Sequence, residues 1–120
     1  MATLIDPDFR ARLRALNDKY AAGVPGLMQA IATARERCDS EGPRLEPLTA
    51  LHRALHAVAG SASTFGFAAL GQECRRLEQL VRGLLNAPGE VLAEWPALSG
   101  QVSDLLRWAA HDAAAPTYQA

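Results

Sequence analysis

Between residues 67 and 84, apolar side chains recur at alternating steps of three and four residues. The positions are Phe67, Leu70, Cys74, Leu77, Val81 and Leu84. Because an α-helix has 3.6 residues per turn, this spacing gathers them onto one face. Such a face has to be buried against other helices, and its regularity is typical of a helical bundle.

A similar stripe begins near the N-terminus. Its members are Phe9, Leu13, Leu16 and Tyr20, followed by Leu27, Ile31, Ala34 and Cys38. Asp6 and Pro7 are typical of a helix start. Asp6 can supply an N-cap oxygen, and a proline is suited to the first turn. Pro25 cannot donate a backbone hydrogen bond, so we expect a kink or short break at residues 22–25. The segment is predicted to be one kinked helix or two nearly collinear helices.

Helix breakers divide the rest of the chain. Gly42 and Pro43 precede a helix predicted over 46–63, and Thr64 is expected to cap the next helix, which ends near Leu85. A last helix follows the Asn86–Gly89 breaker. Residues 113–120 lack periodicity and are expected to fray, and no segment has the pattern of a strand. The predicted fold is an all-α, up-and-down antiparallel four-helix bundle with an additional or kinked N-terminal helix.

Composition excludes several classes of function. A chain of 120 residues fits one domain, residues 1–120, and its net charge of −1 offers no excess of positive charge for nucleic acid. It has no apolar run of the ~20 residues that a membrane span needs, and no signal peptide pattern. The two cysteines, Cys38 and Cys74, lack metal-ligand spacing. We therefore expect a cytoplasmic monomer without nucleic-acid or membrane partners.

His56 is the residue whose side chain is best suited to a chemical reaction. It is followed four residues later by Gly60, so the two are neighbours on the surface of the predicted helix. A glycine inside a helix lowers its stability by ~1 kcal/mol relative to alanine, which suggests that the glycine has a functional reason. With no side chain at position 60, a bulky partner could approach the imidazole closely. An imidazole titrates near neutral pH and can offer an unprotonated, nucleophilic nitrogen.

The run His56-Ala57-Val58-Ala59-Gly60-Ser61-Ala62, with Phe65-Gly66 after it, resembles the histidine-containing phosphotransfer (HPt) domain. Leu70, Cys74, Leu77 and Glu78 are similar to that family's second bundle helix. The resemblance implies that His56 is the phosphoacceptor and that Glu78 orients its ring. It also implies a phosphorelay in which His56 exchanges a phosphoryl group with the aspartate of response-regulator receiver domains.

The same resemblance implies the partners and cofactors. The partners are receiver domains, a hybrid sensor histidine kinase, or both, and the magnesium ion belongs to the receiver. The chain itself is expected to bind no cofactor or metal, and it lacks a glycine-rich nucleotide loop, which argues against an autonomous kinase. Both a stand-alone shuttle and a domain of a hybrid kinase fit the sequence.

One position departs from the family pattern. Many members carry a lysine three residues after the histidine, where this chain has Ala59, predicted to lie on the exposed face. Four nearby basic side chains are candidate substitutes for that charge, and four small residues complete the predicted binding surface. The basic candidates are His52, Arg53, Arg75 and Arg82, and the small ones are Ala59, Gly60, Ser63 and Gly71.

Two alternatives to phosphotransfer stay open at this point. His52 and His56 are four residues apart, as are Cys74 and Glu78 on the next helix, so a His/Cys/Glu metal site is conceivable. A helical bundle that docks partners without accepting a phosphoryl group is the other alternative. Sequence alone does not separate this adaptor from a phosphotransfer protein.

Overall fold

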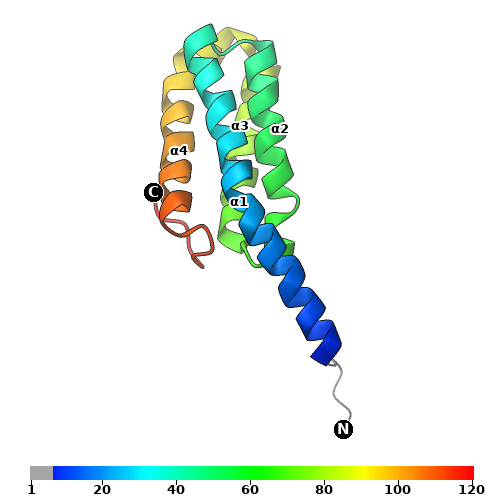
Figure 1. Ribbon diagram of the computed structural model, residues 1–120. Helices are drawn as coiled ribbons and strands as arrows, with labels where there is room; N and C mark the ends of the chain where they lie inside the picture. Colours follow the sequence, from blue (N-terminus) through cyan, green and yellow to red (C-terminus); the bar gives the residue numbers. More distant parts are fainter. Residues whose placement is uncertain (1–6) are drawn as a thin grey trace.

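In a computed structural model, which describes residues 7–120, the chain is almost entirely helical. Its long helices are α1 (Pro7–Glu41), α2 (Leu45–Ala59), α3 (Ala68–Asn86) and α4 (Val91–Asp112). Two short 3-10 helices, η1 (Ala62–Phe65) and η2 (Pro88–Glu90), lie in the connections. The four long helices run up and down beside one another (Figure 1), which confirms the predicted all-α four-helix bundle.

The predicted stripes form one core between the helices. Leu51, Leu55 and Val58 of α2 are completely buried, as are four members of the stripe of α3. The latter are Leu70, Cys74, Leu77 and Val81. Burying a leucine or valine side chain contributes ~1.5–3 kcal/mol, so these two helices are held firmly in register. That register places the polar edges of α2 and α3 side by side.

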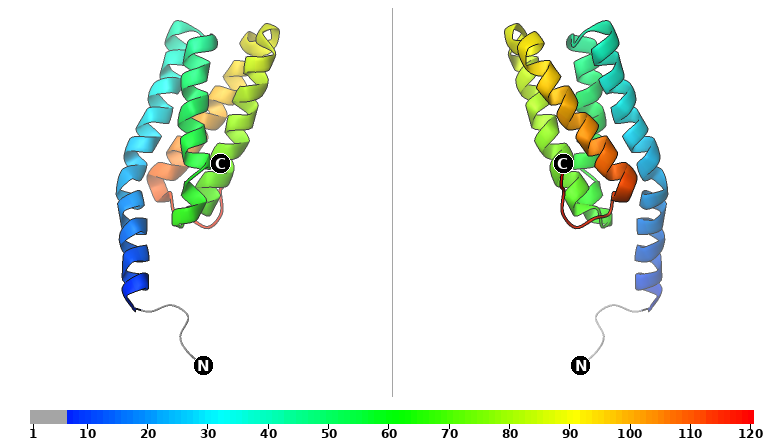
Figure 2. Two further views of the ribbon diagram at one scale, coloured as in Figure 1. Left: turned by 90° about the vertical axis from the view of Figure 1, so that its right-hand side faces the viewer. Right: turned by 90° about the vertical axis from the view of Figure 1, so that its left-hand side faces the viewer.

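The helix α1 is continuous through Pro25, so the option of two separate helices was wrong. Pro25 is exposed, and Ala21, whose carbonyl loses its usual helical donor at residue 25, is exposed too, so water can supply that hydrogen bond. Figures 1 and 2 show the helix changing direction where it leaves the bundle, which agrees with the predicted kink. The predicted cap residue Asp6 lies outside the described residues.

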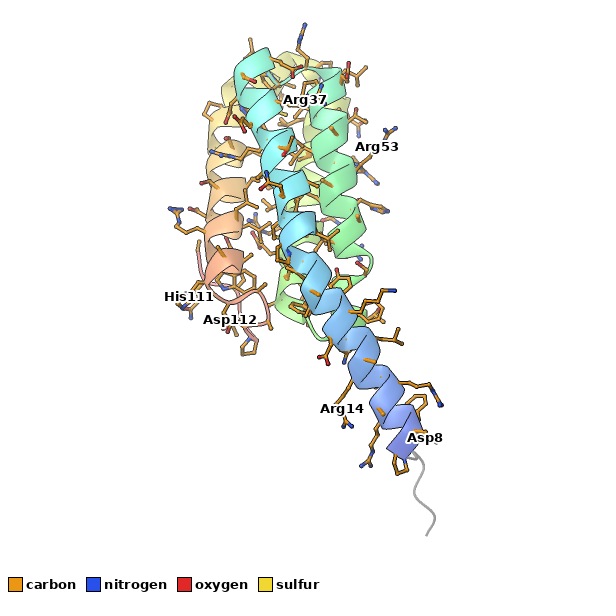
Figure 3. The ribbon with its side chains drawn as sticks, viewed as in Figure 1. Asp8, Arg14, Arg37, Arg53, His111 and Asp112 are labelled. Atoms are coloured by element: carbon orange, nitrogen blue, oxygen red, sulfur yellow. The ribbon has the colours of Figure 1, made fainter. Side chains whose placement is uncertain are left out.

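The N-terminal part of α1 extends beyond the end of the bundle (Figures 1 and 2), and the molecule measures 61 × 25 × 24 Å. Phe9, Leu13 and Leu16 are 46%, 43% and 52% exposed there, although they belong to the predicted apolar stripe. The stripe packs onto the core only from Tyr20 onward. Periodicity shows which face of a helix is apolar but not where the neighbouring helices end. In Figure 3, Asp8 and Arg14 point outward from this extension.

The helix that carries His56 ends earlier than predicted, at Ala59 rather than Ser63. Gly60 is its C-cap, and its N–H donates to the carbonyl of His56 at 3.0 Å. The chain then forms η1 and turns at Gly66, whose φ of +92° favours glycine. Thr64 lies inside η1, so the prediction that it caps α3 was wrong.

Residues 113–120 form no helix, since α4 ends at Asp112, but Ala113 and Tyr118 pack back against the bundle instead of fraying. The ring of Tyr118 meets Trp108 edge-on, with centroids 5.1 Å apart. Burial raises the pKa of the Tyr118 hydroxyl. Within residues 7–120, no helix is both long enough and apolar enough to cross a membrane.

Candidate functional site

His56 lies in the last turn of α2, and 64% of its side chain is exposed. Its Nδ1 atom is 2.5 Å from Oε1 of Glu78 on α3, whose side chain is only 6% exposed. The two helices are antiparallel neighbours with a shared core, so the contact depends on their packing register. The structure thus brings together the two residues that the resemblance singled out.

This contact determines which ring nitrogen is available for chemistry. A carboxylate accepts hydrogen bonds, so Nδ1 of His56 carries the proton and donates it toward Glu78. In the neutral ring, Nε2 is then the unprotonated nitrogen with its lone pair available. Because the ring is largely exposed, a partner can reach it from solvent.

Glu78 faces two further basic groups. Nε2 of His52 is 3.4 Å and Nη2 of Arg82 is 3.8 Å from the same Oε1 atom that contacts His56. The rings of His52 and His56 lie nearly parallel, 12° apart in orientation with centroids separated by 6.0 Å. A buried carboxylate is costly unless it is paired and hydrogen-bonded, and this cluster supplies the compensation.

Arg75 does not point its charge at the imidazole. Its Nη2 donates to the carbonyl of Ala59 at 3.0 Å, satisfying one of the last carbonyls of α2. Arg53 is exposed and extends away from α2 in Figure 3. Of the three arginines predicted near the site, Arg82 is the one in contact with Glu78.

The prediction that Ala59 is exposed was wrong, because only 5% of it is accessible. Gly60 is exposed but caps α2 rather than lying inside it, so the cost of a mid-helix glycine does not apply. A Cβ atom added at Gly60 would meet only the carbonyl oxygen of His56, at 3.4 Å. The space around Gly60 is therefore open, and its effect on access to the imidazole stays a prediction.

Gly71 is buried and does not face the imidazole. A Cβ atom there would lie 3.0 Å from Oγ of Ser63 and 3.3 Å from Cβ of Ala62. The missing side chain thus lets α3 approach η1 closely. Ser63 is exposed on the other side of that contact.

The sequence reasoning treated Tyr20 only as a stripe residue and missed its contacts beside the site. The hydroxyl of Tyr20 donates to Oγ of Ser61 at 2.8 Å. The hydroxyl of Ser61 in turn donates to the carbonyl of Ala57 at 2.7 Å. The Tyr20 ring also stacks on Phe65, with centroids 4.9 Å apart. These contacts tie the loop after His56 to α1. A buried tyrosine usually needs a partner for its hydroxyl, and this was the signal available in the sequence.

The arrangement does not assemble the conceivable His/Cys/Glu metal site. Cys74 is completely buried in the core, and burial raises the pKa of its thiol to about 12, so it is not a ready thiolate ligand. Across the described part of the chain, no group of three or more His, Cys, Asp or Glu side chains is placed to hold a metal ion.

Comparisons with known proteins agree with this geometry. The model of the Hpt domain family matches residues 12–108. The chemotaxis protein CheA of Klebsiella aerogenes is 44% identical over 45 residues, a segment that is 38% of this chain but 7% of that protein. No solved structure matches significantly. Since the family model spans most of the chain, including both α2 and α3, the chain belongs to the Hpt domain family of phosphorelay proteins.

Proposed function

We propose that His56 accepts a phosphoryl group on Nε2 from the aspartyl phosphate of a receiver domain and passes it to another receiver. The observation that supports this most directly is the 2.5 Å contact between Nδ1 of His56 and Glu78, combined with an imidazole that is 64% exposed. The contact leaves Nε2 as the nucleophile, and the exposure lets a second protein approach it in line.

In the proposed step, the lone pair of Nε2 forms a bond to phosphorus. The bond between phosphorus and the aspartate oxygen breaks, and its electron pair stays on that oxygen, restoring the carboxylate of the receiver. The proton on Nδ1 remains, so the phosphorylated ring gains positive charge. Glu78 lies where a negative charge stabilises that ring. Transfer to a second receiver is the reverse sequence of bond changes.

Because Ala59 replaces the usual lysine, other groups have to compensate the phosphoryl charge. Arg82 is the best placed, since its exposed guanidinium already lies 3.8 Å from Glu78 and can swing outward. Arg53 is exposed on α2, one turn before His56. We assign Arg75 a supporting role at the end of α2, with Gly60 and Ser63 on the open surface where a receiver would dock.

The proposal includes the surroundings of the reaction. The partners are receiver domains, a hybrid sensor histidine kinase, or both, in the cytoplasm. The catalytic magnesium ion is brought by the receiver, and this chain, as a monomer, contributes no cofactor of its own. Positive side chains around the site would favour a receiver whose own docking surface is acidic, because complementary charge raises encounter rates.

A panel of phosphorylated receiver domains tests the proposal. Label should move from at least one receiver to the wild-type chain and not to His56→Gln, which should keep the helical fold because 64% of the His56 side chain is exposed. Labelled ATP alone should label neither protein. A receiver that binds this chain but never transfers its label would support the docking adaptor instead.

A further inference from the structure

His52 lies one turn before His56 on α2, yet its environment is different. Its side chain is 20% exposed, compared with 64% for His56, and its Nε2 atom is buried. A partner protein therefore cannot reach this nitrogen as it can reach His56. The role of His52 has to come from its contacts inside the site.

The buried Nε2 of His52 faces a carboxylate. It is 3.4 Å from Oε1 of Glu78 and, among the described residues, has no aligned hydrogen-bond partner. An unprotonated nitrogen 3.4 Å from a carboxylate oxygen would be repelled by it, so the proton of the neutral His52 ring is favoured on Nε2. His56 carries its proton on Nδ1, because that atom contacts the same oxygen. The two neutral rings therefore hold opposite tautomers.

We propose that His52 is a positioning residue for His56 and acts through Glu78. Two N–H groups on α2 converge on one oxygen and hold the carboxylate against Nδ1 of His56. The other charged group at that oxygen is Arg82 of α3, at 3.8 Å and 61% exposed, and it can pull the carboxylate toward solvent. Without His52, Glu78 is less constrained and the proton of His56 is less strongly kept on Nδ1. The catalytic part of this inference rests on the proposed function.

The tautomers can be measured without a partner. Ring-nitrogen chemical shifts in ¹⁵N-labelled protein, recorded above the pH where the rings are charged, should show Nε2–H at His52 and Nδ1–H at His56. The third histidine, His111, is exposed on α4 and serves as an internal reference. In His52→Leu, the shifts of His56 should move toward the Nε2–H form. Unchanged His56 shifts would overturn the inference.

Transfer kinetics provide a second readout. At saturating phosphorylated receiver, His52→Leu should accept label about 3–10-fold more slowly, with little change in KM, since a polar contact to a charged group is lost but the docking surface is intact. His52→Gln should recover most of the rate because its amide nitrogen reaches to the depth of Nε2. His52→Asn is the matched control, since its shorter amide does not reach Glu78.

The outcomes separate the inference from the proposed function. If the His52→Gln and His52→Asn variants transfer equally slowly, His52 acts only by filling space and the inference fails. This comparison also holds should His52→Leu fold poorly. If no receiver in the panel labels His56, the proposed function fails, and the tautomer measurement still decides whether His52 positions Glu78 and His56.

Discussion

At the scale of single residues, Ala59 shows how the environment changes the meaning of a substitution. Its position after His56 suggested an exposed site where the family's lysine could simply be restored. In the structure it is 5% exposed, and its carbonyl accepts a hydrogen bond from Arg75. A lysine there has to lift its ammonium group out of a packed site, because a buried unpaired charge is very costly.

We therefore expect Ala59→Lys to destabilise the fold by about 1–3 kcal/mol, the usual range for overpacking a buried position. Urea unfolding monitored by circular dichroism measures this. Ala57→Lys is the matched control, since Ala57 is exposed on the same helix and its change should stay within ~0.5 kcal/mol. Equal stability of the two variants would show that position 59 tolerates a long side chain.

Glu78 allows a complementary prediction about chemistry. Glu78→Gln keeps the size of the side chain but removes the charge that faces His56. We expect phosphoryl acceptance to slow about 10-fold or more, because hydrogen bonds to charged groups contribute ~1.5–3 kcal/mol. Single-turnover transfer from a labelled receiver measures the rate. A wild-type rate in this variant would leave Glu78 with only a structural role.

The pairing of His56 with Glu78 was predicted from the sequence, but the burial of Ala59 was not. The pairing was implied by the resemblance to the HPt domain, and the shared core of α2 and α3 explains why the two side chains meet. The burial of Ala59 depends on how the chain continues after α2, where η1 and Arg75 of α3 close over the helix end. Periodicity within one helix contains no information about such a closure.

At the scale of elements, α3 carries two glycines with different surroundings. Gly71 faces η1 so closely that an added Cβ would lie 3.3 Å from Cβ of Ala62, whereas Gly83 has nothing within 4 Å. Ala62 is completely buried and cannot move aside easily. A glycine at either position lowers the helix propensity of α3, and only the packing distinguishes the two.

Gly83→Ala should therefore stabilise the protein by about 0.5–1 kcal/mol, the ordinary gain in helix propensity. Gly71→Ala should lose that gain and become net destabilising, because the added methyl group presses on Ala62 and Ser63. Thermal unfolding of the pair under identical conditions measures the difference. A gain for Gly71→Ala as large as that for Gly83→Ala would mean that η1 shifts without cost.

At the scale of the whole molecule, the four predicted helices and their antiparallel order were correct because each apolar stripe is regular and each break is marked by glycine or proline. The extension of α1 beyond the bundle was not predictable, since the apolar stripe continues through Leu13 and Leu16. The packing of Tyr118 on Trp108 was also missed, because a segment without periodicity gives no pattern to follow.

The bundle also buries its two thiols, and for this reason its free energy of unfolding depends on pH. Burial raises the pKa of Cys74 from 9.0 to about 12 and that of Cys38 to about 11. Above pH 9, the unfolded chain loses these protons while the folded chain keeps them, so the free energy of unfolding falls as pH rises. Cys74→Ala should lose less stability than the wild type between neutral pH and about pH 10. Parallel losses in urea unfolding would contradict a shifted Cys74.

The central claim is that Glu78 occupies Nδ1 of His56 and leaves Nε2 to carry the phosphoryl group. After transfer from a receiver, NMR of the ¹⁵N- and ³¹P-containing chain identifies the phosphorylated nitrogen by its coupling to phosphorus. The structure predicts a single phosphorylated histidine, His56, with phosphorus coupled to Nε2 and a proton retained on Nδ1. Phosphorus on Nδ1 of His56, or on His52, would contradict it.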